Sequence, residues 1–126
     1  MSLVHEELTA TIIGAFYDVY NTLGYGFLES VYENALMIEL KKLGLRAEQQ
    51  VPIAIFYDKK NVGNFFADIL VENVVILELK AVSDINKSHE AQLLNYLKGS
   101  DLEVGLLLNF GASPKVIRKI FQDNNI

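Results

Sequence analysis

The sequence contains no cysteine, which excludes a disulfide framework, a thiolate zinc site and an iron–sulfur cluster. It also lacks any apolar run close to the roughly 18 residues that a membrane span requires. The N-terminus carries His5, Glu6 and Glu7 and no apolar signal core. We therefore expect a soluble, cytoplasmic protein.

Positive charge is also scarce, and the net charge of the 126 residues is -5. This balance argues against a protein that coats nucleic acid indiscriminately, although binding needs only a local basic patch. A composition of 51% hydrophobic and 21% charged residues is typical of a globular chain. Since no repeat, linker or low-complexity tract interrupts the chain, we expect one domain over residues 1–126.

Two short apolar segments, residues 64–71 and 74–81, predict a β-hairpin with charges that a pure core would reject. Asp68 interrupts the first segment, and Glu78 and Lys80 interrupt the second. Side chains alternate between the two faces of a strand, so Glu78 and Lys80 share one face. The hairpin therefore holds a carboxylate and an ammonium group side by side on a rigid element.

The length of the turn decides where Asp68 points. A two-residue turn at 72–73 would direct Asp68 away from Glu78, whereas a three-residue loop at 72–74 would place them opposite each other on one face. Two carboxylates beside a lysine suit a hard divalent cation and metal-assisted phosphodiester hydrolysis. The alternative is an ordinary cross-strand ion pair on a half-exposed sheet.

Periodic apolar residues predict further elements around this hairpin. Helices are expected over residues 4–23, 27–43 and 87–98, and further strands over residues 46–57 and 104–108. Pro52 indicates that the earlier of these strands lies at a sheet edge, or that the strand starts there. The apolar run at 104–108 is typical of a strand covered on both faces, which makes the chain from 74 to 104 a right-handed βαβ crossover. Ser113 and Pro114 predict the start of a last helix.

The second helix carries an inward stripe and a polar face. The residues expected to face the core are Leu28, Val31, Tyr32, Ala35, Leu36, Leu40 and Leu43. Glu29 lies in the first turn, with Tyr32 and Glu33 on the same face. The helix dipole alone accounts for a glutamate there, and the functional alternative is that Glu29 points into the hairpin site. Gln92 and Tyr96, one turn apart on the third helix, are either ordinary helix surface or part of the same site.

The order of these elements and residues resembles the PD-(D/E)XK nuclease superfamily. Residues 26–32, GFLESVY, match the GxxExxY signature of one small-protein family in it, and QLLNY at 92–96 is similar to the helix motif of RecB-type nuclease domains. Ala67 stands where the superfamily has its proline. The resemblance spans nearly the whole chain and implies a restriction-endonuclease-like α/β fold, with a central mixed sheet between helices in three layers.

The resemblance also implies roles for individual residues. The catalytic set is Glu29, Asp68, Glu78, Lys80, Gln92 and Tyr96. Asp68, Glu78 and the Leu79 carbonyl would bind Mg²⁺ or Mn²⁺, and Glu29 would complete the acidic site directly or through a water. Lys80 would orient the attacking water or stabilise charge on the phosphate. The glutamine and tyrosine would hold the metal-bound water, the site or the nucleic-acid backbone.

The function implied is a metal-dependent nuclease acting on DNA. A nucleic-acid or protein binding module that retains the nuclease fold is the alternative, and two-carboxylate glycoside hydrolysis is less well supported because it does not require Lys80. Basic residues that could follow a nucleic-acid backbone are Lys59, Lys60, Lys87, Lys98, Lys115, Arg118 and Lys119. The oligomeric state stays open, with a homodimer as one option.

Overall fold

A mixed sheet of five strands organises the structure. The computed structural model describes residues 5–122 and contains α1 (Glu6–Leu23), α2 (Glu29–Lys42), β1 (Ala47–Tyr57), β2 (Lys60–Val71), β3 (Val75–Lys80), α3 (Lys87–Gly99), β4 (Val104–Asn109) and β5 (Lys115–Ile120). The strands lie side by side in chain order. All neighbours are antiparallel except β3 and β4, which are parallel and joined through α3. The predicted α/β fold and the parallel pairing of the Glu78 strand are thus confirmed.

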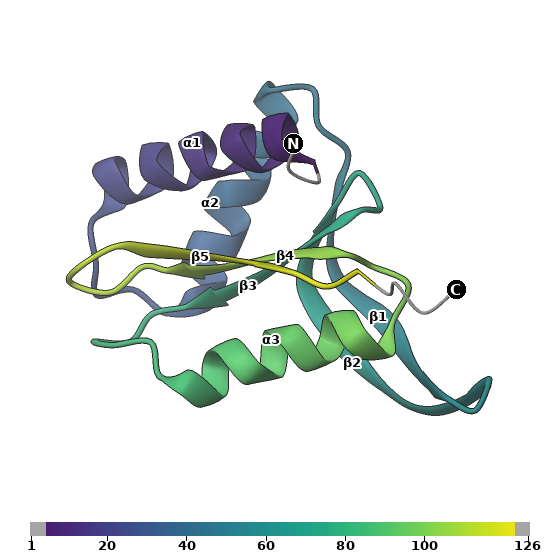
Figure 1. Cartoon of the computed structure of the whole chain (residues 1–126). Helices are drawn as coiled ribbons and strands as arrows, with labels where there is room; N and C mark the ends of the chain where they lie inside the picture. The colour runs from purple at the N-terminus through teal and green to yellow at the C-terminus, as the bar shows by residue number, and fades with distance from the viewer. Residues whose placement is uncertain (1–4, 123–126) are drawn as a thin grey trace.

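Helices cover both faces of the sheet, so the protein has three layers (Figure 1). α1 and α2 pack on one face through a core that includes Phe16, Tyr32 and Leu77. α3 packs on the other face, where Leu93 lies in a second core with Ile76. Because Ile76 and Leu77 are neighbours in β3 and enter opposite cores, β3 is covered on both faces, as expected for a strand of a parallel pair.

α1 follows the predicted helix closely. Ile12, Phe16 and Val19 are buried at intervals of three and four residues, as one inward stripe requires. The predicted start of the helix at residue 4 lies outside the described residues. No helix within residues 5–122 combines the length and the apolar character needed to cross a membrane.

α2 buries a narrower stripe than predicted. Tyr32, Leu36 and Leu40 are fully buried, one turn apart. Three residues predicted to face the core are exposed instead: Leu28 (76%), Val31 (39%) and Leu43 (52%). The first and last of these flank the helix, since α2 is shorter at both ends than predicted, and Val31 lies on its solvent side.

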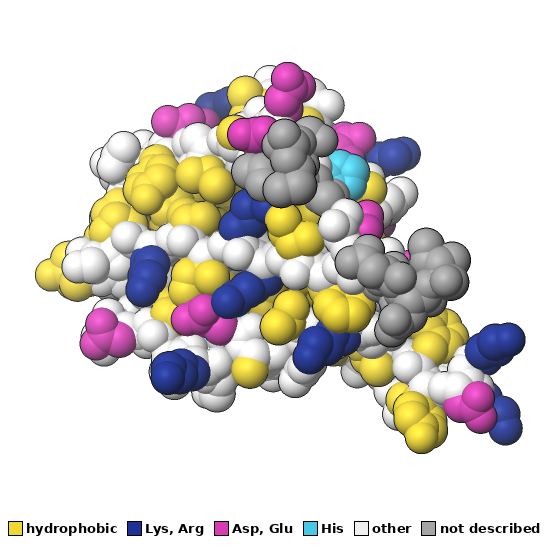
Figure 2. All heavy atoms as spheres, viewed as in Figure 1, with side chains coloured by type: hydrophobic (Ala, Val, Ile, Leu, Met, Phe, Trp, Pro, Cys, Tyr) yellow, Lys and Arg dark blue, Asp and Glu magenta, His cyan; other side chains and the backbone are white. Residues whose placement is uncertain are grey.

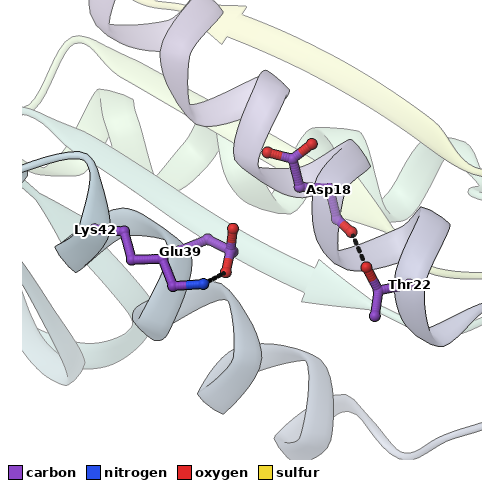
Figure 3. A network of polar contacts seen from close by, with 4 residues as sticks. All are labelled: Asp18, Thr22, Glu39 and Lys42. Carbon is purple, nitrogen blue, oxygen red and sulfur yellow. Dashed lines mark hydrogen bonds and ion pairs between the residues drawn. The ribbon is translucent and has the colours of Figure 1, made fainter.

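α1 and α2 run beside each other and leave a surface hollow of about 350 Å³ between them. The polar contacts drawn in Figure 3 stay within each helix: Thr22 Oγ1 donates to the Asp18 carbonyl oxygen at 2.9 Å, and Lys42 pairs with Glu39 at 3.0 Å. An exposed ion pair of this kind contributes little stability. The two helices are therefore held together mainly by their apolar contacts with each other and with the sheet.

Tyr32 of the GxxExxY signature ties α2 to the loop that precedes it. Its ring stacks on Phe110 at a centroid distance of 4.3 Å. Its hydroxyl donates to the Gly24 carbonyl oxygen at 2.7 Å and accepts from the Phe27 N–H at 3.2 Å. Gly24 has a φ of 69°, a left-handed conformation that glycine adopts without steric cost. The signature tyrosine therefore has a structural role.

The turn between β2 and β3 has the three-residue form. Val71 lies opposite Val75, which leaves residues 72–74 as the loop, and residues 72 and 73 have left-handed φ values of 53° and 58°. The antiparallel register then brings Asp68 and Glu78 to the same level of the sheet. Of the two turn lengths considered from the sequence, the structure has the one that allows a carboxylate pair.

The segment after β4 is a strand, and the predicted last helix is wrong. β5 pairs antiparallel with β4, with Val116 opposite Leu108. Val116 and Ile120 pack in the α1–α2 core, while Ile117 packs on the α3 side, which is the two-residue period of a strand. Pro114 suggested a helix start, but three β-branched residues among six favour a strand where an open edge of β4 can accept it.

Candidate active site

The carboxylate pair lies where β2 and β3 separate. The paired register of these strands extends only as far as Ile69 opposite Leu77. Beyond this point the Leu79 N–H donates to the side chain of Asp68, at 2.8 Å from Oδ2. The carboxylate of Asp68 thus accepts a backbone hydrogen bond from the strand that carries Glu78, which fixes one of its two oxygens.

The surroundings of Glu78 are unfavourable for a charged carboxylate. Its Oε1 atom is buried and accepts no hydrogen bond. Burial, followed by the charge and hydrogen bonding of Asp68, raises the pKa of Glu78 from 4.5 to about 8, against the opposing effect of Lys80. The pair therefore requires a proton or a cation to be stable in its folded position.

Lys80 shares the face of Glu78 at the end of β3, and the neighbouring strand fixes where β3 ends. The Lys80 carbonyl oxygen accepts from the Phe110 N–H at 2.8 Å. The buried side chain of Asn109 holds the backbone of Val82, accepting from its N–H at 3.0 Å and donating to its carbonyl at 2.9 Å. A Cβ on Gly111 would lie 2.0 Å from the Val82 carbonyl oxygen, so only glycine permits this approach. The ammonium group of Lys80 thus extends from a rigid strand end.

Gln92 and Tyr96 come from α3, the helix that covers the face of β3 on which Glu78 and Lys80 follow Ile76. The ring of Tyr96 stacks on Phe65 of β2 with a centroid distance of 3.6 Å and an interplanar angle of 7°. Burial, followed by the charges of Glu78 and Asp68, raises the pKa of the Tyr96 hydroxyl, while a hydrogen bond with Gln92 lowers it. The two α3 residues and the two carboxylates therefore form one polar group.

The α2 carboxylate that acts on this group is Glu33, one turn after the predicted Glu29. The charge of Glu33 contributes to the raised pKa of Glu78. Glu29 is exposed and lines a separate hollow of about 410 Å³ beside Tyr25 and Phe27. Within residues 5–122, no three His, Cys, Asp or Glu side chains lie close enough together to hold a metal ion. The predicted three-carboxylate site is therefore not assembled, and the carboxylate pair remains.

Gln50 links Glu33 to Asp68 and was not identified from the sequence. Its amide nitrogen lies 3.0 Å from Glu33 Oε1 and 3.4 Å from Asp68 Oδ1, and the neighbouring Gln49 donates to Glu33 Oε2 at 2.8 Å. Gln50 has a φ of 51°, which is uncommon for a residue with a Cβ and clusters at functional sites. Gln50 and Asp68 are both missing from the paired register of β1 and β2, which is unshifted on either side of them, so the regular pairing of the strands is interrupted at the site.

Together, the fold and the site define the class of this protein. A three-layer α/β domain carries a half-buried Asp–Glu pair and a lysine on its splayed central strands. The model of the PD-(D/E)XK nuclease superfamily matches residues 6–120. The chain belongs to this superfamily.

A solved structure shares the fold. The crystal structure of SSO0001 aligns with a TM-score of 0.55 and 18% sequence identity, over 95% of this chain and 61% of that chain. This likeness concerns the fold alone, and the present chain spans less than two thirds of the length of SSO0001. No curated protein matches the sequence.

Proposed function

We propose that this protein is a metal-dependent nuclease that hydrolyses phosphodiester bonds of DNA, and that it belongs to the GxxExxY family within the superfamily. The observation that carries the proposal is the buried, unpartnered Oε1 atom of Glu78 beside the Asp68 carboxylate. Buried polar atoms in native proteins nearly always have a partner. A cation that prefers oxygen ligands would supply one and would neutralise the pair, so the residues present fit a divalent ion.

Asp68, Glu78 and the Leu79 carbonyl would hold Mg²⁺ or Mn²⁺. A bound ion of this kind polarises a phosphate and generates a nucleophilic water. Lys80, held two residues from Glu78 on a rigid strand end, places a positive charge where charge develops on the phosphate. Gln92 and Tyr96 would position the water or a backbone oxygen through their side-chain donors.

A catalytically silent binding module is the second candidate, and one observation favours it. Only two carboxylates come together at the site, whereas three were predicted, and no metal-binding group of three is found within residues 5–122. A module of this kind would bind nucleic acid or protein without needing an ion. Divalent-ion binding by the carboxylate pair therefore separates the two candidates.

The test is the melting temperature of metal-free protein titrated with MgCl₂ or MnCl₂, followed by DNA cleavage. A ligand that binds only the folded state stabilises it by an amount that grows with the logarithm of its concentration. We expect the wild type to be stabilised and Asp68→Ala and Glu78→Ala to be unresponsive. Lys80→Ala should keep most of the stabilisation and lose cleavage, because Lys80 serves the reaction and not the ion.

An exposed carboxylate of β1 provides the matched control. Glu48→Ala removes one negative charge without touching the pair, and it should respond to the ions like the wild type. If neither ion changes the melting temperature of the wild type, and Asp68→Ala responds in the same way as the wild type, the nuclease proposal is wrong. The binding module is then favoured.

A further inference from the structure

Three lysines from two separate elements converge on one carboxylate, away from the candidate active site. Lys119 of β5 pairs with Glu90 of α3 at 2.9 Å. The hydrogen bond from Lys119 lowers the pKa of Glu90, and the charges of Lys119, Lys115 and Lys87 lower it further. We refer to Lys87, Lys115 and Lys119 as the β5–α3 lysine cluster.

The cluster is more positive than its one counter-ion can balance. Three ammonium groups face a single carboxylate, in a chain whose net charge is -5. A surface hollow of about 370 Å³ lies at the cluster, lined by Lys87, Glu90, Ala91, Leu94 and Lys119. Figure 2 shows Lys and Arg side chains gathered over the β5 and α3 region of this face. The surface is thus suited to an anion that several lysines can contact at once.

The cluster and the carboxylate pair lie on opposite sides of α3. Gln92 and Tyr96 turn from this helix towards the pair, whereas Glu90 turns towards β5. A helix with its side chains is about 10–12 Å wide, and each nucleotide of a duplex strand advances about 3.4 Å along the axis. A strand cleaved at the pair can therefore reach the cluster within a few nucleotides.

Protection of a sheet edge is the competing explanation for part of the cluster. β5 is an edge strand, and lysines on edge strands prevent pairing with other chains. This accounts for Lys115 and Lys119. It does not account for Lys87, which comes from α3 and converges on the same carboxylate.

We propose that Lys87, Lys115 and Lys119 bind the phosphodiester backbone of the nucleic-acid substrate beside α3. The identity of the partner rests on the proposed nuclease function. The lysines contact phosphates and carry no sequence preference, so they position the strand and leave the chemistry to the carboxylate pair. Glu90 competes with the phosphates for Lys119, and this competition sets how strongly the surface binds.

The test measures binding of fluorescein-labelled single-stranded and duplex DNA to metal-free protein in EDTA, by fluorescence anisotropy at several KCl concentrations. The double variant Lys115→Gln/Lys119→Gln should bind more weakly. On duplex DNA its salt slope, log K against log[KCl], should be shallower by about 0.9 for each phosphate that the variant no longer neutralises. Glu90→Gln should have the opposite effect and bind more tightly at low salt.

The control variant is Lys41→Gln/Lys42→Gln at the end of α2. It makes the same change in net charge and also breaks one exposed ion pair, that of Lys42 with Glu39. It lies on the opposite face of the sheet, so its affinity and salt slope should equal those of the wild type. If both double variants lose the same amount of affinity, the effect comes from net charge alone, and the proposal is wrong.

Other results also overturn it. Unchanged DNA binding by Lys115→Gln/Lys119→Gln, together with self-association in size-exclusion chromatography, would assign these lysines to edge protection alone. A wild type that binds no DNA at low salt would remove the surface from nucleic-acid binding altogether. Because binding is measured without metal, the outcome is separate from cleavage: an inactive wild type that binds DNA through the cluster contradicts only the nuclease proposal.

Discussion

Replacing Glu78 by glutamine should change how the stability of the protein depends on pH. In the unfolded chain Glu78 ionises near its ordinary pKa of 4.5, and in the folded chain its pKa is about 8. Between these values the folded state binds more protons than the unfolded state, so the free energy of unfolding falls as pH rises. The stabilisation is complete below pH 4.5 and is lost as pH rises through about 8.

The magnitude follows from the distance between the two pKa values. Each pH unit of difference is worth about 1.4 kcal/mol, so the full loss between pH 4.5 and about 8 is on the order of 5 kcal/mol. A loss of this size is a large fraction of the roughly 5–15 kcal/mol that is typical of a domain. Glu78→Gln cannot ionise, so it should lack this part of the pH dependence.

The assay is urea unfolding followed by circular dichroism, in EDTA, at about pH 5 and about pH 8.5, on either side of the folded pKa. Wild type and Glu78→Gln should be of similar stability at the lower pH, and the variant should be several kcal/mol more stable at the higher pH. Glu48→Gln, the exposed control on β1, should follow the wild type. Parallel curves for wild type and Glu78→Gln across this range would refute the burial and charge repulsion argued for the pair.

Three further predictions concern single residues. Tyr32→Phe should lower the free energy of unfolding by about 1–3 kcal/mol, because the two backbone groups of the α1–α2 loop lose their buried partner; the exposed Tyr57→Phe should be neutral in the same urea assay. Asn109→Ala should cost a similar amount and also slow any cleavage, because the backbone after β3 is released next to the lysine; normal stability would show that the clamp is dispensable. Glu33→Ala should weaken Mn²⁺ binding in calorimetry more than Glu29→Ala does. A larger loss of affinity in Glu29→Ala would show that Glu29, and not Glu33, belongs to the site.

The sequence left the length of the hairpin turn open, but it did show what each length would do to the carboxylates. Strand side chains alternate strictly, so the placement of Asp68 opposite Glu78 required an odd loop, and the structure contains one at residues 72–74. The apolar run at 104–108 likewise identified a strand buried on both faces. Such features depend only on the alternation of side chains along a strand, which every β-strand has.

The choice between Glu29 and Glu33 could not be made in this way. Residues four apart lie on one face of a helix, and only the position of α2 over the sheet decides which of them approaches Glu78. Gln50 could not be identified from the sequence either, because its left-handed backbone, with a φ of 51°, has no counterpart in the local residue pattern. β5 was missed because a strand depends on the free edge of β4, which the local pattern of residues 113–120 does not contain.

The most direct test of the central claim is a time course of DNA cleavage in Mg²⁺ by wild type and by Lys80→Ala, purified in parallel. The account predicts cleavage by the wild type that stops on addition of EDTA, and no cleavage by Lys80→Ala even though its melting temperature still rises with the ion. Lys80→Ala that cleaves at the wild-type rate would contradict the account, because the activity would then come from another site or from a contaminant.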